Sequence, residues 1–192
     1  MVDQERAHIC RKLNPRGPCP TAMVDPIGTG LQVTILSLQA AVKNYNAYVE
    51  KKVMQTDQVV CQEVGRRVSA ILARITIDHK KSHRDKNRSA RRGYEELIRI
   101  CNSFLEDIRM SITRPQDGSH MGISKPGKKS LEALVNHDLA VVNALEECKK
   151  NMHEIVYTGS ETIVHNIDHF SLLIEGAKEK FRGREKIFQG CL

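Results

Sequence analysis

The sequence has few large rings among its 192 residues: four Phe, four Tyr and no Trp. A core without large rings must be filled by Leu, Ile, Val and Ala, as in most helix bundles. β-Hairpin signals and alternating strand and helix patterns are also missing, which excludes the common β and α/β architectures. Since 40% of the residues are hydrophobic and 28% are charged, the composition is that of a soluble globular protein.

Long apolar runs are missing as well. No stretch approaches the roughly 20 apolar residues that span a bilayer. The charged residues 1–6 are not followed by the apolar segment of a secretory signal. The six cysteines form no CxxC pair, and Cys61, Cys101 and Cys148 lie within helical patterns, where reduced Cys acts as a small apolar residue. We therefore expect an intracellular protein of the cytoplasm or nucleus, without a disulfide framework.

The apolar residues that are present recur every three or four positions in five segments. This period is typical of amphipathic helices, so the sequence predicts an all-α, elongated antiparallel bundle of about five long helices. Residues 1–28 show no such period and contain four Pro and two Gly, which predicts a flexible arm. The expected helices span residues 29–53, 56–77, 94–112, 130–157 and 160–188.

The middle of the chain carries an unusual tetrapeptide, Gly118-Ser119-His120-Met121. These four residues are what a common bacterial expression vector leaves at an N-terminus after thrombin cleavage, so within the linker 118–129 they predict an engineered junction. Either a loop was excised or two interacting fragments were fused. The net charge is +7 over residues 1–117 and zero over 118–192, which favours two pieces.

The main functional hypothesis is a non-enzymatic helical interaction module: an adaptor, a scaffold or a subunit of a complex. A helical hairpin over 130–192 has too few partners to cover its own apolar stripes. We expect it to complete the bundle by packing on the three-helix segment 29–117, so that the two halves of the chain bind each other. The candidate partner-binding residues are Leu134, Val141, Leu145, Cys148, Met152, Ile163, Ile167, Phe170 and Ile174.

The alternative hypothesis rests on the basic connection 79–92, which holds seven Lys or Arg and one Asp. Polyanions are attracted to such clusters by the electrostatic field and by counterion release, and nuclear-import receptors also recognise short basic runs. The segment contains no aromatic residue on which a base would stack. It predicts an electrostatic binder of nucleic acid or anionic membrane. The candidate residues are Lys80, Lys81, Arg84, Lys86, Arg88, Arg91 and Arg92.

Other polar clusters predict no chemistry. His165 and His169 share one face of a helix, but the local spacing supplies no third metal ligand. The triplet 137–139, His-Asp-Leu, resembles the start of histidine-kinase dimerisation helices, but Ala140 follows where that family has a basic residue. No Gly-rich phosphate loop or nucleophile elbow is present. We therefore expect no catalytic residue, no metal and no cofactor.

Overall fold

The computed structural model describes residues 26–48, 53–113, 128–156 and 160–188. These residues form helices α2 (Pro26–Ala41), α3 (Val53–Arg84), α4 (Arg88–Thr113), α5 (Lys128–Val156) and α6 (Ser160–Phe188), with no strand among them. The predicted all-α class, the helix number and the bundle are confirmed. The chain divides into two units after Gly30, and the description below concerns residues 31–192.

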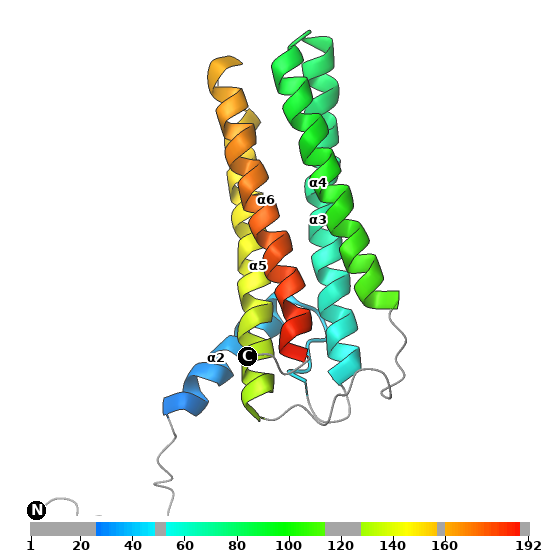
Figure 1. Cartoon of the computed structure of the whole chain (residues 1–192). Coiled ribbons are helices and arrows are strands. Elements are labelled where there is room, and N and C mark those ends of the chain that lie inside the picture. Colours follow the sequence, from blue (N-terminus) through cyan, green and yellow to red (C-terminus); the bar gives the residue numbers. More distant parts are fainter. Residues whose placement is uncertain (1–25, 49–52, 114–127, 157–159, 189–192) are drawn as a thin grey trace, which may run out of the picture. The chain divides into compact units, whose positions relative to one another are not determined.

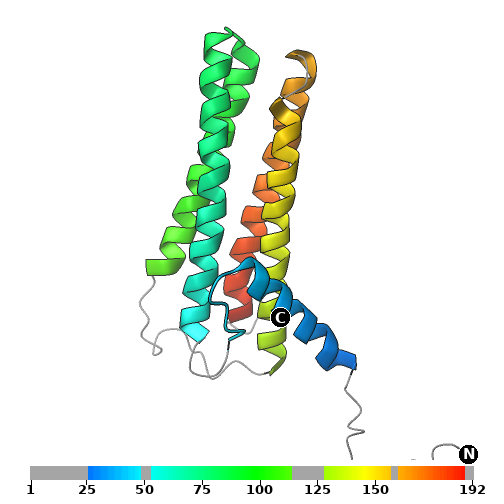
Figure 2. The same cartoon turned by 180° about the vertical axis from the view of Figure 1, so that it is seen from behind.

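Helices α3 to α6 form a four-helix bundle of two hairpins. Helix α3 pairs with α4 and α5 pairs with α6, each as an antiparallel hairpin (Figure 1). Between the hairpins, α3 packs on α5 and α4 packs on α6, so these two cross-hairpin pairs run parallel (Figure 2). The longest helix, α3, has 32 residues and is about 48 Å long at 1.5 Å per residue.

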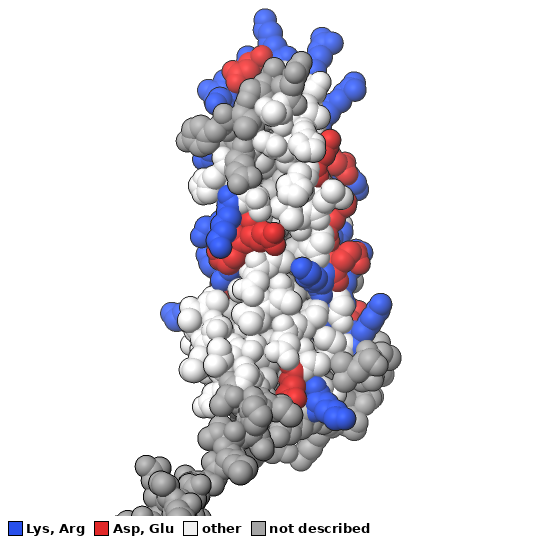
Figure 3. Space-filling view, turned by 90° about the vertical axis from the view of Figure 1, so that its left-hand side faces the viewer, with Lys and Arg blue, Asp and Glu red and all other residues white. Residues whose placement is uncertain are grey.

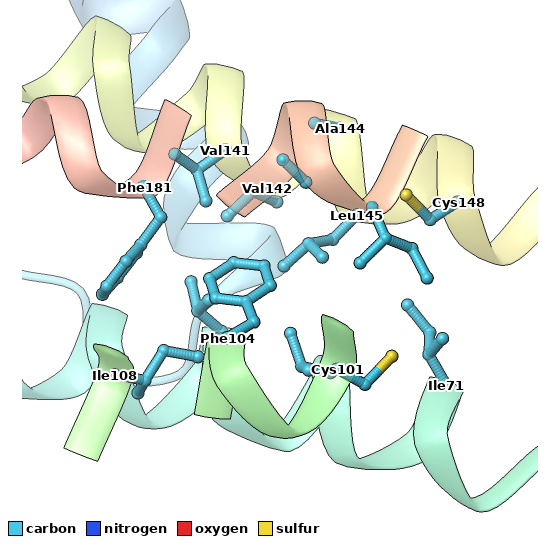
Figure 4. Packing of buried hydrophobic residues seen from close by; sticks show 14 of the residues in the cluster. Ile71, Cys101, Phe104, Ile108, Val141, Val142, Ala144, Leu145, Cys148 and Phe181 are labelled. Atoms are coloured by element: carbon cyan, nitrogen blue, oxygen red, sulfur yellow. The ribbon is translucent and has the colours of Figure 1, made fainter. Parts of the chain in front are cut away.

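The core of the bundle is built from the predicted stripes. Phe104 and Ile108 of α4 lie opposite Phe181 of α6, with Val142 and Leu145 of α5 beside them (Figure 4). All five side chains are at most 4% exposed. The scarcity of aromatic residues is therefore met by close packing of aliphatic side chains around a few buried rings, which is how interiors reach their density.

One glycine lets the two hairpins approach closely. Gly93 of α4 faces Ile167 of α6, and a Cβ built on Gly93 would lie 2.7 Å from Cγ2 of Ile167. That distance is shorter than any ordinary carbon contact, so a larger residue at 93 would push α4 and α6 apart. The contact fixes the spacing of the hairpins near the end of the bundle where α4 begins.

The first helix is shorter than the sequence pattern predicted. Helix α2 ends at Ala41, and residues 42–48 form turns, whereas the pattern predicted one helix over 29–53. Asn44 has a left-handed backbone with φ of 65°, a conformation that commonly ends helices and that Asn adopts more readily than most residues. The apolar period of the sequence continues past the end of α2 at Ala41, because the side chains of Val42, Tyr45 and Tyr48 are buried although these residues lie in turns.

The connection between α3 and α4 is also shorter than expected. Helix α3 begins at Val53, before the predicted cap at Thr56, and continues to Arg84. Only residues 85–87 of the basic segment are non-helical. The hydrophobic period fades after Ile77 because the buried positions of the last two turns of α3 carry polar residues, Asp78 and Ser82.

Three expectations fall on residues that the structure does not describe. They are residues 1–25 of the predicted arm 1–28, the tetrapeptide 118–121 and most of the linker 118–129. Residues 26–28 were wrongly assigned to the arm, since α2 begins at Pro26. Helix α5 begins at Lys128, two residues before the predicted Ser130, and α6 spans 160–188 as predicted. Within the described residues, no helix is both long enough and apolar enough to cross a bilayer.

Candidate functional site

The basic candidates gather at the end of the bundle where α3 turns into α4, called here the cationic tip (residues 79–92). The turn is tight: the Asn87 N–H donates to the Ser82 carbonyl at 3.0 Å. Asn87 then caps α4, because its side-chain Oδ1 accepts from the Ala90 N–H at 3.1 Å. Basic side chains project from this upper end of the molecule (Figure 3).

The structure brings all seven predicted basic residues to this tip from both helices and the turn. Six are exposed, and Arg91 is half-buried. Arg91 pairs with Glu95 at 3.4 Å, and His79 lies 3.6 Å from the same carboxylate. The Glu95 carboxylate thus offsets positive charge only on the side of the tip that is nearest the bundle. The exposed six are Lys80, Lys81, Arg84, Lys86, Arg88 and Arg92.

An open pocket of ≈ 480 Å³ lies on the α3 side of the tip. Its lining is His79, Lys80, His83 and Arg84, which lie on one face of the last turns of α3. The side chains of this lining are two imidazoles, an ammonium and a guanidinium, each of which carries an N–H donor, so the pocket suits an anion rather than a cation.

The predicted helix-stripe residues lie in the core between the hairpins. Seven of the nine are buried, and Met152 and Ile163 are half-buried against the core. They therefore form part of the hydrophobic core of the bundle. The buried seven are Leu134, Val141, Leu145, Cys148, Ile167, Phe170 and Ile174.

A buried polar cluster, which sequence reasoning missed, joins the 42–48 turn to three helices. Tyr48 donates to Asp138 Oδ2 of α5 at 2.6 Å, and Tyr45 donates to the same oxygen at 3.3 Å. Arg184 of α6 lies 3.4 Å from Asp138 Oδ1 and 2.9 Å from Asp57 of α3, and it also donates to the Tyr48 hydroxyl. The cluster ties together segments that are distant in sequence.

Burial controls the chemistry of this cluster. Desolvation raises the pKa of Asp138 above its usual range, although the charge of Arg184 opposes the shift. Desolvation also raises the pKa of Tyr48 well above 10, so its hydroxyl keeps the proton that it donates. Burial alone would lower the pKa of Arg184, but Asp138, Tyr48 and Asp57 raise it overall. Asp138 and Arg184 are 1% and 4% exposed, so a substrate has no access to them.

The sequence did contain a signal for this cluster. Asp138 falls on the α5 stripe between Leu134 and Val141, and Arg184 extends the α6 seam three residues beyond Phe181. Opposite charges on two facing apolar stripes indicate a buried ion pair. The positions were overlooked because each stripe was followed through its apolar residues alone.

A second polar contact holds the end of α2. Arg67 of α3 donates to the Ala41 carbonyl at 3.1 Å and pairs with Glu63 at 2.7 Å. It also pairs with Glu146 of α5. The guanidinium therefore satisfies a carbonyl at the C-terminus of α2 while it joins α3 to α5.

The other histidine patterns remain apart. His165 and His169 are both exposed on α6. No group of three or more His, Cys, Asp or Glu residues close enough to hold a metal ion occurs in the described part of the chain. His137, from the His-Asp-Leu triplet, instead bonds through Nε2 to the Lys180 carbonyl at 2.5 Å, and burial lowers the pKa of its imidazole.

The comparisons with known proteins returned no match. No protein-family model, curated protein or solved structure matches the chain.

Proposed function

We propose that the chain is a non-enzymatic helical interaction module, an adaptor, scaffold or complex subunit, in which the α5–α6 hairpin binds the α3–α4 hairpin. The observation that carries the proposal is the burial of the α5 and α6 stripes against α3 and α4. Leu145, Ile167 and Phe170 are each at most 1% exposed. Burying such side chains stabilises an interface by about 1.5–3 kcal/mol each.

The buried polar cluster supports a binding role over a catalytic one. Its carboxylate and guanidinium are closed to solvent and are used to hold the 42–48 turn and three helices together. Paired charges inside a helical interface add specificity for one arrangement more readily than they add stability. The cluster thus selects this pairing of hairpins among other ways to bury apolar stripes.

The compartment proposed for this module is the cytoplasm or the nucleus. Cys61, Cys101 and Cys148 are buried and free, as expected of thiols that serve as small apolar residues in a reducing environment.

The test of this function is a matched pair of substitutions on α6. Phe170→Asp places a charge in the hairpin interface, whereas His169→Asp places the same side chain at the exposed neighbouring position. We expect Phe170→Asp to unfold the protein or reduce its melting temperature by more than 10 °C, and His169→Asp to leave it nearly unchanged. Equal melting temperatures for both variants would contradict the proposal.

A further inference from the structure

The arginines of the chain divide into two groups by their partners. On the flanks of the bundle, the described arginines pair with carboxylates, as Arg66 does with Glu63 and Arg99 with Glu96. At the tip, three arginines make no ion pair within the described residues: Arg84, Arg88 and Arg92. Among the arginines that the structure describes, the unpaired ones are thus concentrated at the cationic tip. The paired arginines are Arg66, Arg67, Arg74, Arg91, Arg99, Arg109, Arg182 and Arg184.

The charges at the start of α4 oppose helix stability. A helix N-terminus carries a partial positive charge, which acidic residues normally complement. The first turn of α4 contains no acidic residue and begins with Arg88, and Arg91 and Arg92 follow one turn later. An anion bound at this end would relieve both the repulsion among the arginines and their repulsion by the helix end.

The chemistry of the tip selects phosphate groups rather than bases. Arginine forms bidentate hydrogen bonds with phosphate oxygens, and the exposed side chains of the tip approach from both helices and the turn. The segment 79–92 contains no aromatic residue for base stacking. Recognition through phosphates alone is independent of base sequence.

The surface of the tip also distinguishes nucleic acid from a lipid bilayer. Stable attachment to a membrane requires an apolar anchor or a lipid chain in addition to a basic patch. The large exposed hydrophobic side chains of the described residues are Val33, Leu36, Ile77, Met110 and Leu172, and none of them lies within 79–92. Purely electrostatic attraction is sufficient for non-specific binding to nucleic acid.

We propose that the cationic tip binds the phosphodiester backbone of nucleic acid without sequence specificity, through Arg84, Arg88 and Arg92 together with the lysines around them. This activity goes beyond the packing of the hairpins on each other, because the six exposed basic side chains of the tip lie outside the core. Each phosphate that is neutralised releases a counterion, so the affinity decreases steeply as salt rises.

The experiment measures fluorescence anisotropy of a labelled 30-base-pair DNA duplex of random sequence, titrated with the full chain from 50 to 200 mM NaCl. The tip variant is Arg84→Glu, Arg88→Glu and Arg92→Glu combined. The control variant is Arg66→Glu, Arg99→Glu and Arg109→Glu, which changes the net charge equally at paired, exposed positions. Circular dichroism checks that both variants keep their helices.

We expect the original chain to bind the duplex and to lose about 10³-fold in affinity over this salt range, as for six phosphate contacts. The tip variant is expected to bind on the order of 100-fold more weakly, and the slope of log K against log salt should become shallower by about 3. The control variant should keep most of the affinity and most of the slope. If either variant has lost its helices, single Arg→Gln substitutions at the same positions give the comparison.

Three results would overturn the proposal. One is no duplex binding at 50 mM NaCl. Another is an equal loss in both variants, which would mean that only the net charge matters. The third is tighter binding to vesicles of phosphatidylcholine and phosphatidylserine than to the duplex at equal anion concentration, which would assign the tip to a lipid surface. None of these results depends on how the two hairpins bind each other.

Discussion

The hydroxyl of Tyr48 donates a 2.6 Å hydrogen bond to Asp138, although 90 positions separate the two residues in the chain. Tyr48 has a left-handed backbone with φ of 53°, and Ala47 beside it has φ of 52°. Such conformations cost of order 1–3 kcal/mol in residues other than Gly and persist only where their surroundings impose them. The buried cluster around Asp138 supplies that constraint on the 42–48 turn.

The two charges of the cluster, Asp138 and Arg184, should be coupled in their effect on stability. We expect Arg184→Leu to lower the free energy of unfolding by about 3–5 kcal/mol, because it leaves Asp138 buried without a cation. Asp138→Leu should lower it by less, because Arg184 keeps Asp57 at 2.9 Å. The double variant should lose less than the sum of the two, since no charge of the pair is then left alone. Urea denaturation of the four proteins gives the coupling energy.

A solvent-accessible ion pair on the same bundle is the control for this cycle. Arg182 of α6 and Asp107 of α4 lie 2.9 Å apart, with side chains 49% and 27% exposed. Their substitution by Leu should change the free energy of unfolding by about 1 kcal/mol or less. If the buried pair shows no larger coupling than this control, the cluster does not hold the 42–48 turn.

Substitution by Ala of one glycine in α4 and of one in α6 should change the stability in opposite directions. Gly93→Ala should destabilise the protein by about 1–3 kcal/mol, because its Cβ would lie 2.7 Å from Ile167 and force the hairpins apart. Gly176→Ala should stabilise it by about 0.5–1 kcal/mol, because a Cβ there meets no atom within 4 Å and Ala favours helix. Thermal unfolding of both variants checks the prediction, and stabilisation by Gly93→Ala would contradict the close contact.

Alkaline pH should weaken the fold through two thiols. Burial raises the pKa of Cys101 and of Cys148 from 9.0 to about 12. Above pH 9 the unfolded chain releases these protons while the folded chain keeps them, so stability falls as pH rises from 9 toward 12. The slope is up to about 1.4 kcal/mol per pH unit for each thiol.

The measurement is the urea midpoint between pH 8 and 10, below the range in which most lysines lose their charge. The variant Cys101→Ala with Cys148→Ala should start at lower stability but show a flatter dependence on pH. An unchanged slope in this variant would show that other groups cause the alkaline loss.

The sequence predicted those features that follow from local periodicity. The α6 seam of Ile163, Ile167, Phe170 and Ile174 repeats every three or four residues, and the helix has the predicted bounds. The break after Ala41 was missed because Val42 and Tyr45 continue the apolar period in a turn that depends on contacts with distant residues. A local pattern contains no information about such contacts.

Some features of the candidate sites also follow from the local sequence, and others depend on the folded structure. The basic residues of the tip are neighbours in sequence, so their gathering in space was foreseeable. Arg66 and Arg99 are paired, whereas Arg84 and Arg88 have no ion-pair partner in the described part of the chain, and this difference depends on where carboxylates lie in the folded helices. The Tyr48–Asp138–Arg184 cluster joins residues from three parts of the chain, and only the packing of the hairpins brings them together.

The most direct test of the interaction module is to produce residues 1–117 and 122–192 as separate chains in one cell. The purified material is then passed through gel filtration with light scattering. If the α5–α6 hairpin recognises the α3–α4 hairpin through the stripes of Leu145, Ile167 and Phe170, the two chains should co-elute as a stable 1:1 complex, and Phe170→Asp should separate them. If 122–192 stays unfolded and never joins 1–117, the hairpins do not bind each other as independent pieces and the account is wrong.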